Sequence, residues 1–342
     1  MEPGPSDRGV FVLSAIQVYL TAAASAFGSR ILPSEEVDEA YGMPIGKLRT
    51  RAGILSVAYA TENETEESLA ADSCQKVLEQ SGELRENLGG VVAASETHHA
   101  YPSLAAALHA RLKIPEWRMA LDAGNGCLAL LQVLFVAQAL ITTSRAETMV
   151  VATSDVHSRA LGPGRSAGEF GGLFGDGASA FLLSSRAPGK GQFAYKLGEF
   201  FFGCASQYAE AIAVCEAGGG ELDVQFDGEG LSRAAVNRME QVLSEVERRS
   251  GIGREKVSAF ATHQPNPRLV KLLAKQLDVP MSTFPPIAET KGNLGSSMCG
   301  AALHAAFEKA RGQALGERGA VFLASLAPGL LFGGGWMVPV AG

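Results

Sequence analysis

Short apolar runs alternate along this chain with longer stretches in which apolar residues recur every three or four positions. The short runs lie at residues 10–16, 91–95, 148–154, 178–183, 257–262 and 320–324. Runs of this length, rich in aliphatic and aromatic residues, are typical of strands buried on both faces. Because helical stretches separate them, the pattern predicts an α/β fold.

The helical stretches are expected between these strands, at residues 68–80, 102–112, 231–249 and 267–277. A further helix should open with the apolar run that ends at Ile141, and an alanine-rich one should follow Gly292-Asn293 and end at Lys309. Pro33-Ser34, followed by two glutamates, predicts another helix start, because acidic residues favour the positive end of the helix dipole. The basic segment 48–54 is expected to be a loop.

The pattern also predicts two similar halves. Residues 186–191 are rich in glycine, proline and charge, as linkers often are. The segment after them repeats the strand and helix order of the segment before. We therefore expect a loose tail at 1–9 without features of a signal peptide, one half at 10–187 and a second at 188–342.

Residues 123–144 contain no charged side chain, which raises the alternative of a membrane helix. The apolar part covers only about 15 residues, whereas a bilayer needs roughly 20. A buried core helix is therefore expected instead.

The composition argues against several classes of function. The 342 residues are 46% hydrophobic and 19% charged, with a net charge of -7, and so lack the basic excess of a general nucleic-acid binder. The five cysteines are odd in number and form no Cys-x-x-Cys pair, which argues against a disulfide framework or a zinc cage. A reducing cytoplasmic setting is expected.

Three residues could carry catalysis. Cys127 follows Asp-Ala-Gly-Asn-Gly where a turn becomes a helix, and the first-turn N–H groups there favour a thiolate. His263 ends an apolar strand, and Asn293 precedes a helix. Each alone is more often a buried, turn or cap residue. Together they supply a nucleophile, a base or donor and an amide donor, which thiol acyl chemistry requires.

A rival nucleophile is Ser166 in Gly-Arg-Ser-Ala-Gly, which fits the Gly-x-Ser-x-Gly elbow of serine hydrolases. That elbow needs a strand directly before the serine and a helix after it. Here Leu-Gly-Pro-Gly precedes the motif, so a loop is expected.

Several motifs in register resemble those of β-ketoacyl-acyl-carrier-protein synthase III. They are Thr-His-His-Ala-Tyr-Pro-Ser at 97–103, the segment 122–127, Phe-Gly-Asp-Gly-Ala at 174–178, His-Gln-Pro-Asn at 263–266 and Gly292-Asn293. The match runs from Val10 to Val338. It implies a thiolase-like fold of two pseudo-duplicated halves with a layered α-β-α-β-α core.

The resemblance also implies roles. Cys127 is acylated by a thioester, while His263 and Asn293 bind the carbonyl of a second thioester. The N–H groups of Cys127 and Gly329 form the oxyanion hole. Neither cofactor nor metal is implied.

The same resemblance implies a homodimer in which Tyr101 reaches into the partner's acyl pocket. Leu128, bulky where small residues are usual, is expected to reshape that pocket. Arg51 and Arg268 stand where the family docks phosphate or an acyl carrier protein, and solvated surface arginines are the alternative.

Departures from the family pattern concern the primer site. Lys47 stands at the position of a tryptophan that stacks on adenine, the loop 159–174 is longer, and Glu229 replaces an asparagine near the pantetheine path. These differences argue against a coenzyme A primer.

The leading hypothesis is an acyltransferase that condenses an acyl group on Cys127 with a carrier-bound malonyl or β-keto thioester, in specialised polyketide or lipid synthesis. The alternatives are acyl transfer to an alcohol or amine, a silent partner subunit, and a serine hydrolase at Ser166.

Overall fold

The computed structural model describes residues 16–342 apart from 125, 167, 206–211, 220 and 227. Nearly all of the predicted strand 10–16 therefore lies outside the described residues. The chain forms a nine-stranded sheet in the order β11-β12-β13-β8-β1-β7-β6-β4-β5. Its strands are β1 (Tyr19–Phe27), β4 (Gly90–Ala94), β5 (Met119–Asp122), β6 (Thr148–Asp155), β7 (Gly177–Ser184), β8 (Phe193–Cys204), β11 (Val257–Thr262), β12 (Ala320–Ala327) and β13 (Leu331–Ala341).

The sheet consists of two parts with the same internal order. In the first, β4 runs parallel to β6. The strands β6, β7 and β1 follow side by side, each antiparallel to its neighbour. In the second, β11 runs parallel to β12, and β12, β13 and β8 follow in the same way. A short pairing between β1 and β8 joins the parts. The predicted boundary at 187/188 falls in the connection from β7 to β8 and stays a prediction.

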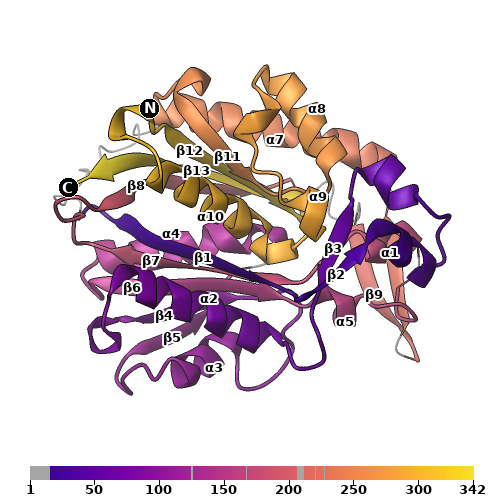
Figure 1. The fold of residues 1–342 in the computed structure, drawn as a ribbon, viewed down its shortest axis with the longest axis horizontal. Coiled ribbons are helices and arrows are strands. Elements are labelled where there is room, and N and C mark those ends of the chain that lie inside the picture. Colours follow the sequence, from indigo (N-terminus) through magenta and orange to yellow (C-terminus); the bar gives the residue numbers. More distant parts are fainter. Residues whose placement is uncertain (1–15, 125, 167, 206–211, 220, 227) are drawn as a thin grey trace, which may run out of the picture.

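Helices cover both parts and fill the space between them (Figure 1). The helices α4 (Ala129–Thr142) and α10 (Met298–Arg311) lie in the middle, and side chains from both share one apolar cluster with β6 and β12. The helices α2 (Glu66–Ser81) and α3 (Leu104–Arg111) cover one outer face. The predicted α-β-α-β-α layering is confirmed.

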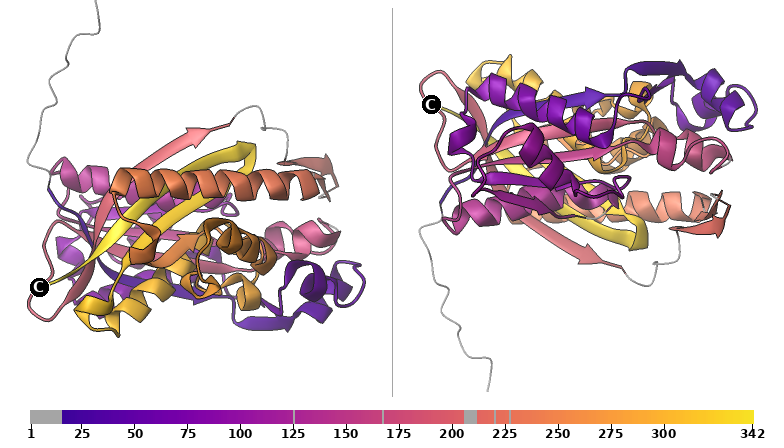
Figure 2. Two further views of the ribbon diagram at one scale, coloured as in Figure 1. Left: turned by 90° about the horizontal axis from the view of Figure 1, so that it is seen from above. Right: turned by 90° about the horizontal axis from the view of Figure 1, so that it is seen from below.

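The opposite outer face carries α7 (Gly228–Ser250) and α8 (Pro267–Leu277), which pack on β11 and β12. Figure 2 shows α7 as one long helix across this part of the sheet. The remaining helices are short: α1 (Ser34–Ala40), α5 (His157–Ala160), α6 (Gly168–Gly172) and α9 (Ala288–Lys291). No described helix is long and apolar enough to cross a membrane. The predicted core position of α4 is confirmed by its place between the two parts.

The prediction of a loop at 48–54 is wrong. Residues Leu48–Ala52 form one turn of π-helix, which ends at Gly53 in the left-handed conformation (φ 83°). Leu48 and Ala52 are buried, so this turn has an apolar side that packs against the rest of the chain. A single turn is too short for periodicity to reveal.

Two antiparallel strand pairs were not predicted from the sequence. They are formed by β2 (Arg30–Pro33) with β3 (Ser56–Tyr59) and by β9 (Ile212–Gly218) with β10 (Glu221–Phe226). Each pair forms its own two-stranded sheet, separate from the main one.

Candidate active site

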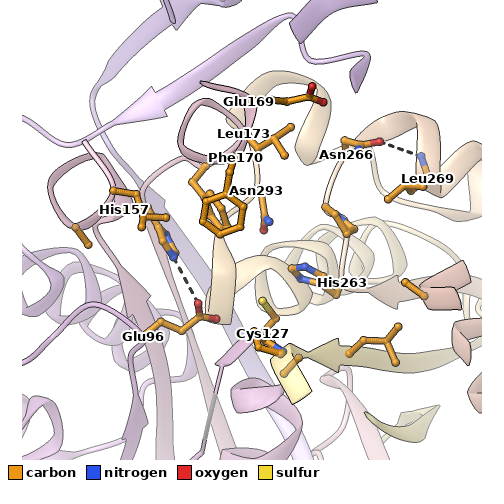
Figure 3. A pocket seen from close by; sticks show the side chains of 18 of the residues that line it. Glu96, Cys127, His157, Glu169, Phe170, Leu173, His263, Asn266, Leu269 and Asn293 are labelled. Atoms are coloured by element: carbon orange, nitrogen blue, oxygen red, sulfur yellow. Dashed lines mark hydrogen bonds and ion pairs between the residues drawn. The ribbon is translucent and has the colours of Figure 1, made fainter. Parts of the chain in front are cut away.

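A cavity of about 1130 Å³ reaches inward from the surface to Cys127. Its lining includes His263 and Asn293, which the sequence predicted as catalytic partners, and Gly329. Figure 3 shows the thiol of Cys127 beside the imidazole of His263, with Asn293 on the same side of the cavity. The fold therefore gathers the predicted nucleophile, its partners and the predicted oxyanion-hole glycine in one site.

Cys127 sits in the 3₁₀ turn Gly126–Leu128, directly before α4. Gly126 has φ 55°, a left-handed conformation that favours glycine. The hydroxyl of Ser325 on β12 donates a hydrogen bond of 2.6 Å to the carbonyl of Cys127. The second half of the sheet thus holds the turn that carries the nucleophile, and the Cys127 residue is only 8% exposed.

Asn293 is fixed by its backbone and by its side chain. Its N–H donates to the carbonyl of Leu173, and its own carbonyl accepts from the N–H of Gly175. The side-chain oxygen Oδ1 accepts from the N–H of Gly295 at 3.1 Å. This bond leaves the NH₂ end of the amide as the group that can donate to a ligand.

His263 follows β11 and is held by a hydrogen bond from its N–H to the carbonyl of Ala324. Burial lowers the pKa of His263 to about 4, against the opposing effect of the Glu96 carboxylate. Its imidazole is therefore neutral at pH 7 and can act as a hydrogen-bond donor or as a base.

Cys127 itself differs from expectation. Burial raises its pKa well above the usual range for a thiol, and the nearby carboxylate of Glu96 raises it further. The helix start was expected to favour the thiolate, but a buried anion beside a second anion is disfavoured. In the resting site the sulfur is a neutral thiol.

The carboxylate beside the thiol belongs to a cluster of Glu96, Asp155 and His157, in which Asp155 and His157 are buried and the Glu96 side chain is 21% exposed. His157 Nε2 lies 3.6 Å from Glu96 Oε2, and the imidazole stacks on Phe174 with 4.5 Å between ring centroids. Burial alone would lower the pKa of His157, but Glu96 and Asp155 raise it to about 9. Burial would raise the pKa of Glu96, yet His157 lowers it overall. The pair is ionised at neutral pH.

Ligand atoms of these three residues lie within 4.8 Å of one another, which is close enough to share a metal ion. The oxygens of Asp155, however, already accept four hydrogen bonds, from Ser95, from the Glu96 N–H and from the N–H and hydroxyl of Ser296. Few lone pairs of Asp155 are left for a cation. The cluster fits a proton on His157 better than a metal ion.

The chain is similar to known proteins in sequence and in structure. The chain matches the family profiles of 3-oxoacyl-[acyl-carrier-protein (ACP)] synthase III at residues 121–199 and of its C-terminal part at residues 248–337. It is 30% identical over 233 residues to the β-ketoacyl-[acyl-carrier-protein] synthase III of Sphingopyxis alaskensis, covering 67% of this chain and 71% of that one. The chain belongs to the synthase III family. The corresponding protein of Haemophilus ducreyi is 27% identical, over 84% of this chain and 86% of its own.

Solved structures share the fold at lower identity. The synthase III of Aquifex aeolicus has a TM-score of 0.82 at 23% identity, over 94% of this chain and 99% of that one. The priming β-ketosynthase of the R1128 polyketide pathway has a TM-score of 0.84 at 20% identity, over 96% and 98%. Xanthomonas campestris OleA gives 0.81 at 17% identity, over 94% and 99%. These structures show the shared fold, while the family profiles and the curated relatives show a condensing enzyme of the synthase III type, a transferase.

Basic side chains line the cavity near its mouth. Arg51 comes from the π-helical turn and Arg268 from the start of α8, two elements in contact with each other. Both are exposed, and neither forms an ion pair with a described residue. Lys47, at the expected tryptophan position of the synthase III family, forms an ion pair of 3.3 Å with Glu169. This part of the wall is therefore charged, with Lys47 at the position where the family has a tryptophan for adenine.

Other predicted residues lie elsewhere. Tyr101 is 99% exposed and outside this chain's cavity, and Leu128 is buried in the central apolar cluster. Ser166 is buried in the segment between α5 and α6, with no strand before it, so the serine elbow lacks its structural context. The side chain of Glu229 lies outside the described residues.

The sequence analysis missed Glu96 and His157. Each lies two residues beyond the end of a buried strand, Glu96 after β4 and His157 after β6, and these strands run parallel in the sheet. Polar residues just beyond the carboxyl ends of neighbouring parallel strands meet at one edge, where α/β sheets bind ligands. That rule would have pointed to them in this synthase III relative.

The charge on His157 should make stability depend on pH. A folded-state pKa of about 9, against an ordinary 6.5, means that the folded chain holds a proton that the unfolded chain loses. This contribution, about 3 kcal/mol at about 1.4 kcal/mol per pKa unit, is complete below pH 6.5 and is lost as the pH rises through 9. Urea unfolding at pH 6.5 and pH 9 measures it, with His157→Gln as the comparison. Equal pH dependence in both proteins would show that His157 is neutral.

Proposed function

We propose that this chain is an acyl-carrier-protein-dependent condensing enzyme that forms an acyl-Cys127 intermediate and extends it by decarboxylative Claisen condensation. The observation that carries the proposal is the meeting of Cys127, a neutral His263 and the NH₂ group of Asn293 in one cavity. The names of the family and of the curated relatives support the carrier and the synthase activity.

In the first step, the sulfur of Cys127 attacks the carbonyl carbon of an acyl thioester. The carbon–sulfur bond to the carrier breaks, and the carrier thiol leaves with the proton. The N–H groups of Cys127 and Gly329 stabilise the oxyanion in this proposal. Gly329 lines the cavity with φ 80°, and its α-carbon faces open space. Two N–H donors aimed at a developing negative charge account for a large share of such catalysis.

In the second step, His263 and Asn293 donate hydrogen bonds to the carbonyl oxygen of a malonyl thioester. These bonds stabilise the enolate that forms as carbon dioxide leaves. The enolate carbon then attacks the acyl carbonyl, the new carbon–carbon bond forms, and Cys127 departs as a thiolate that takes a proton from solvent water. The low pKa of His263 keeps it uncharged, so it stabilises the enolate by hydrogen bonding.

Measuring carbon dioxide tests this chemistry. With an acyl thioester and malonyl carried on acyl carrier protein, one carbon dioxide should appear per product, and the product mass should show a two-carbon extension. Acyl transfer to an added alcohol or amine without carbon dioxide would replace this proposal with the transferase alternative. Inactivity of the chain alone, together with tight binding to a second synthase chain, would replace it with the silent-subunit alternative.

The basic mouth supports docking of a carrier protein through an acidic surface of that partner. Arg51→Ala and Arg268→Ala should each raise KM for an acyl carrier protein substrate about fivefold and leave kcat nearly unchanged. An exposed charge pair is worth about 1 kcal/mol, and salt should weaken it. Arg145→Ala, an exposed arginine outside the cavity lining, is the matched control. KM values unchanged in both mouth variants would place docking elsewhere.

We further propose a homodimer in the cytoplasm. Tyr101 is 99% and Trp117 93% exposed, and both flank the edge strand β5, in which Leu121 is 38% exposed. Large apolar side chains beside an unpaired strand edge are typical of a surface that a partner covers. In such a dimer Tyr101 would reach the partner's acyl pocket.

A further inference from the structure

The carboxylate of Glu96 has an oxygen that accepts no hydrogen bond from a described residue and lies close to the nucleophilic Cys127. One carboxylate oxygen pairs with His157, at 3.6 Å, while the other, Oε1, is buried and has no hydrogen-bond partner among the described residues. Figure 3 shows the carboxylate next to the sulfur of Cys127. A buried ionised oxygen without a donor is costly, so a residue of this kind is expected to meet a donor during function.

Acylation of Cys127 removes the only hydrogen that its sulfur could donate to the Glu96 carboxylate. In the free enzyme the group beside the Glu96 carboxylate is the thiol of Cys127, a weak donor that leaves Oε1 without a hydrogen-bond partner among the described residues. When Cys127 becomes a thioester, its sulfur carries no hydrogen, and the carboxylate then faces the acyl chain instead. An unsubstituted alkyl chain offers no donor there, whereas a hydroxyl or amino group close to the carbonyl does.

His157 fixes the acceptor in place. Its ring is 3% exposed and is held between Phe174 and the carboxylates of Glu96 and Asp155. Because Asp155 is itself bound by Ser95 and Ser296, the Glu96 side chain has little freedom to turn away from the sulfur. Leu161, Phe170 and Leu173 add apolar groups to the cavity lining, which also contains the polar residues Thr97 and His99 close to Glu96 in the sequence.

Resting on the function proposed above, we propose that Glu96, positioned by His157, selects acyl groups that carry a hydroxyl or amino group on carbon 2 or 3. These two carbons are the atoms of the acyl chain closest to the thioester carbonyl, and hence to the carboxylate. A site built to bind a substrate donor rejects the analogue that lacks it, because the polar group of the site is left unpaired. Acyl groups that end in a carboxylate near these carbons are repelled by the like charge.

The test compares four acyl groups on the same acyl carrier protein: butyryl, 2-hydroxybutyryl, 3-hydroxybutyryl and succinyl. The rate of Cys127 acylation is measured by mass spectrometry of the intact protein. At least one hydroxybutyryl group should react about 100-fold faster than butyryl, and succinyl should react more slowly than butyryl. In Glu96→Met, which removes the acceptor at similar length, the preference should disappear and the butyryl rate should rise. Glu86→Met makes the same change on the exposed surface and should behave as wild type.

Butyryl and both hydroxybutyryl groups reacting within threefold of one another in the wild type would overturn the selection by Glu96. So would a preference that Glu96→Met keeps. These results leave the acyl-Cys127 intermediate intact. If none of the four groups modifies Cys127, the proposed function fails, and the selection fails with it. Because the butyryl rate is expected to rise in Glu96→Met, misfolding of the variant cannot imitate the expected result.

Discussion

Replacing His263 with alanine is expected to slow carbon–carbon bond formation by about 100- to 1000-fold, while acylation of Cys127 continues at a rate close to that of the wild type. The imidazole is neutral and lies beside the sulfur of Cys127 in the cavity, where it can donate to the second thioester. Loss of one preorganised donor to a developing oxyanion typically costs this much. Rapid-quench measurement of the acyl-enzyme, together with carbon dioxide release, separates the two steps.

Asn293→Ala should behave in the same way, and the double variant should be little worse than either single one, because groups that act as a unit are not additive. His304→Ala, in α10 and outside the cavity lining, is the matched control and should retain full activity. A His263→Ala enzyme that condenses normally, or one that cannot be acylated, would contradict the role assigned to this residue.

Gly295→Ala is expected to lower the free energy of unfolding by about 3 kcal/mol and to abolish condensation. Gly295 has φ 54°, and a Cβ there would lie 2.3 Å from Cε1 of His157 and 2.8 Å from Oδ2 of Asp155. Backbone strain and overpacking each cost about 1–3 kcal/mol. The N–H of Gly295 also holds Asn293, so displacement of this turn misplaces the amide donor.

Gly42→Ala is the control for that substitution. Gly42 has a similar φ of 66°, but a Cβ there would meet nothing within 4 Å. The free energy of unfolding of Gly42→Ala should therefore fall only by the cost of backbone strain, about 1 kcal/mol. Chemical denaturation measures both variants. Equal losses in the two would show that the buried cluster tolerates the added methyl group.

Sequence reasoning recovered the strands that are buried on both faces and the helices with clear ends. The predicted helix at 267–277 and strand at 257–262 have the bounds of α8 and β11. Two of the strands that it missed consist largely of residues with little strand preference of their own. β1 is rich in alanine, and β13 contains Gly333-Gly-Gly335. A Cβ on Gly334 would lie 2.7 Å from Val246 of α7, so close helix packing explains a run that looks like a loop in the sequence.

The residues of the candidate site could likewise be predicted only in part from the sequence. Cys127, His263 and Asn293 could be proposed from their strand-end and helix-start positions, and the family resemblance joined them. Glu96 and His157 could not be recognised as a pair without knowing that β4 and β6 are neighbours. Their effect on Cys127 depends on burial and on distances of a few ångströms, which local pattern does not contain. The neutral state of the thiol was therefore unexpected.

Mass spectrometry of the protein after incubation with acyl groups on acyl carrier protein tests the central claim most directly. The account predicts one acyl adduct per chain, on the peptide that contains Cys127, and none in Cys127→Ala. Cys204, which is exposed and outside the cavity lining, serves as an internal control for nonspecific reaction and should remain unmodified. An adduct that persists in Cys127→Ala, or an unmodified Cys127 across a broad panel of acyl groups, would contradict it.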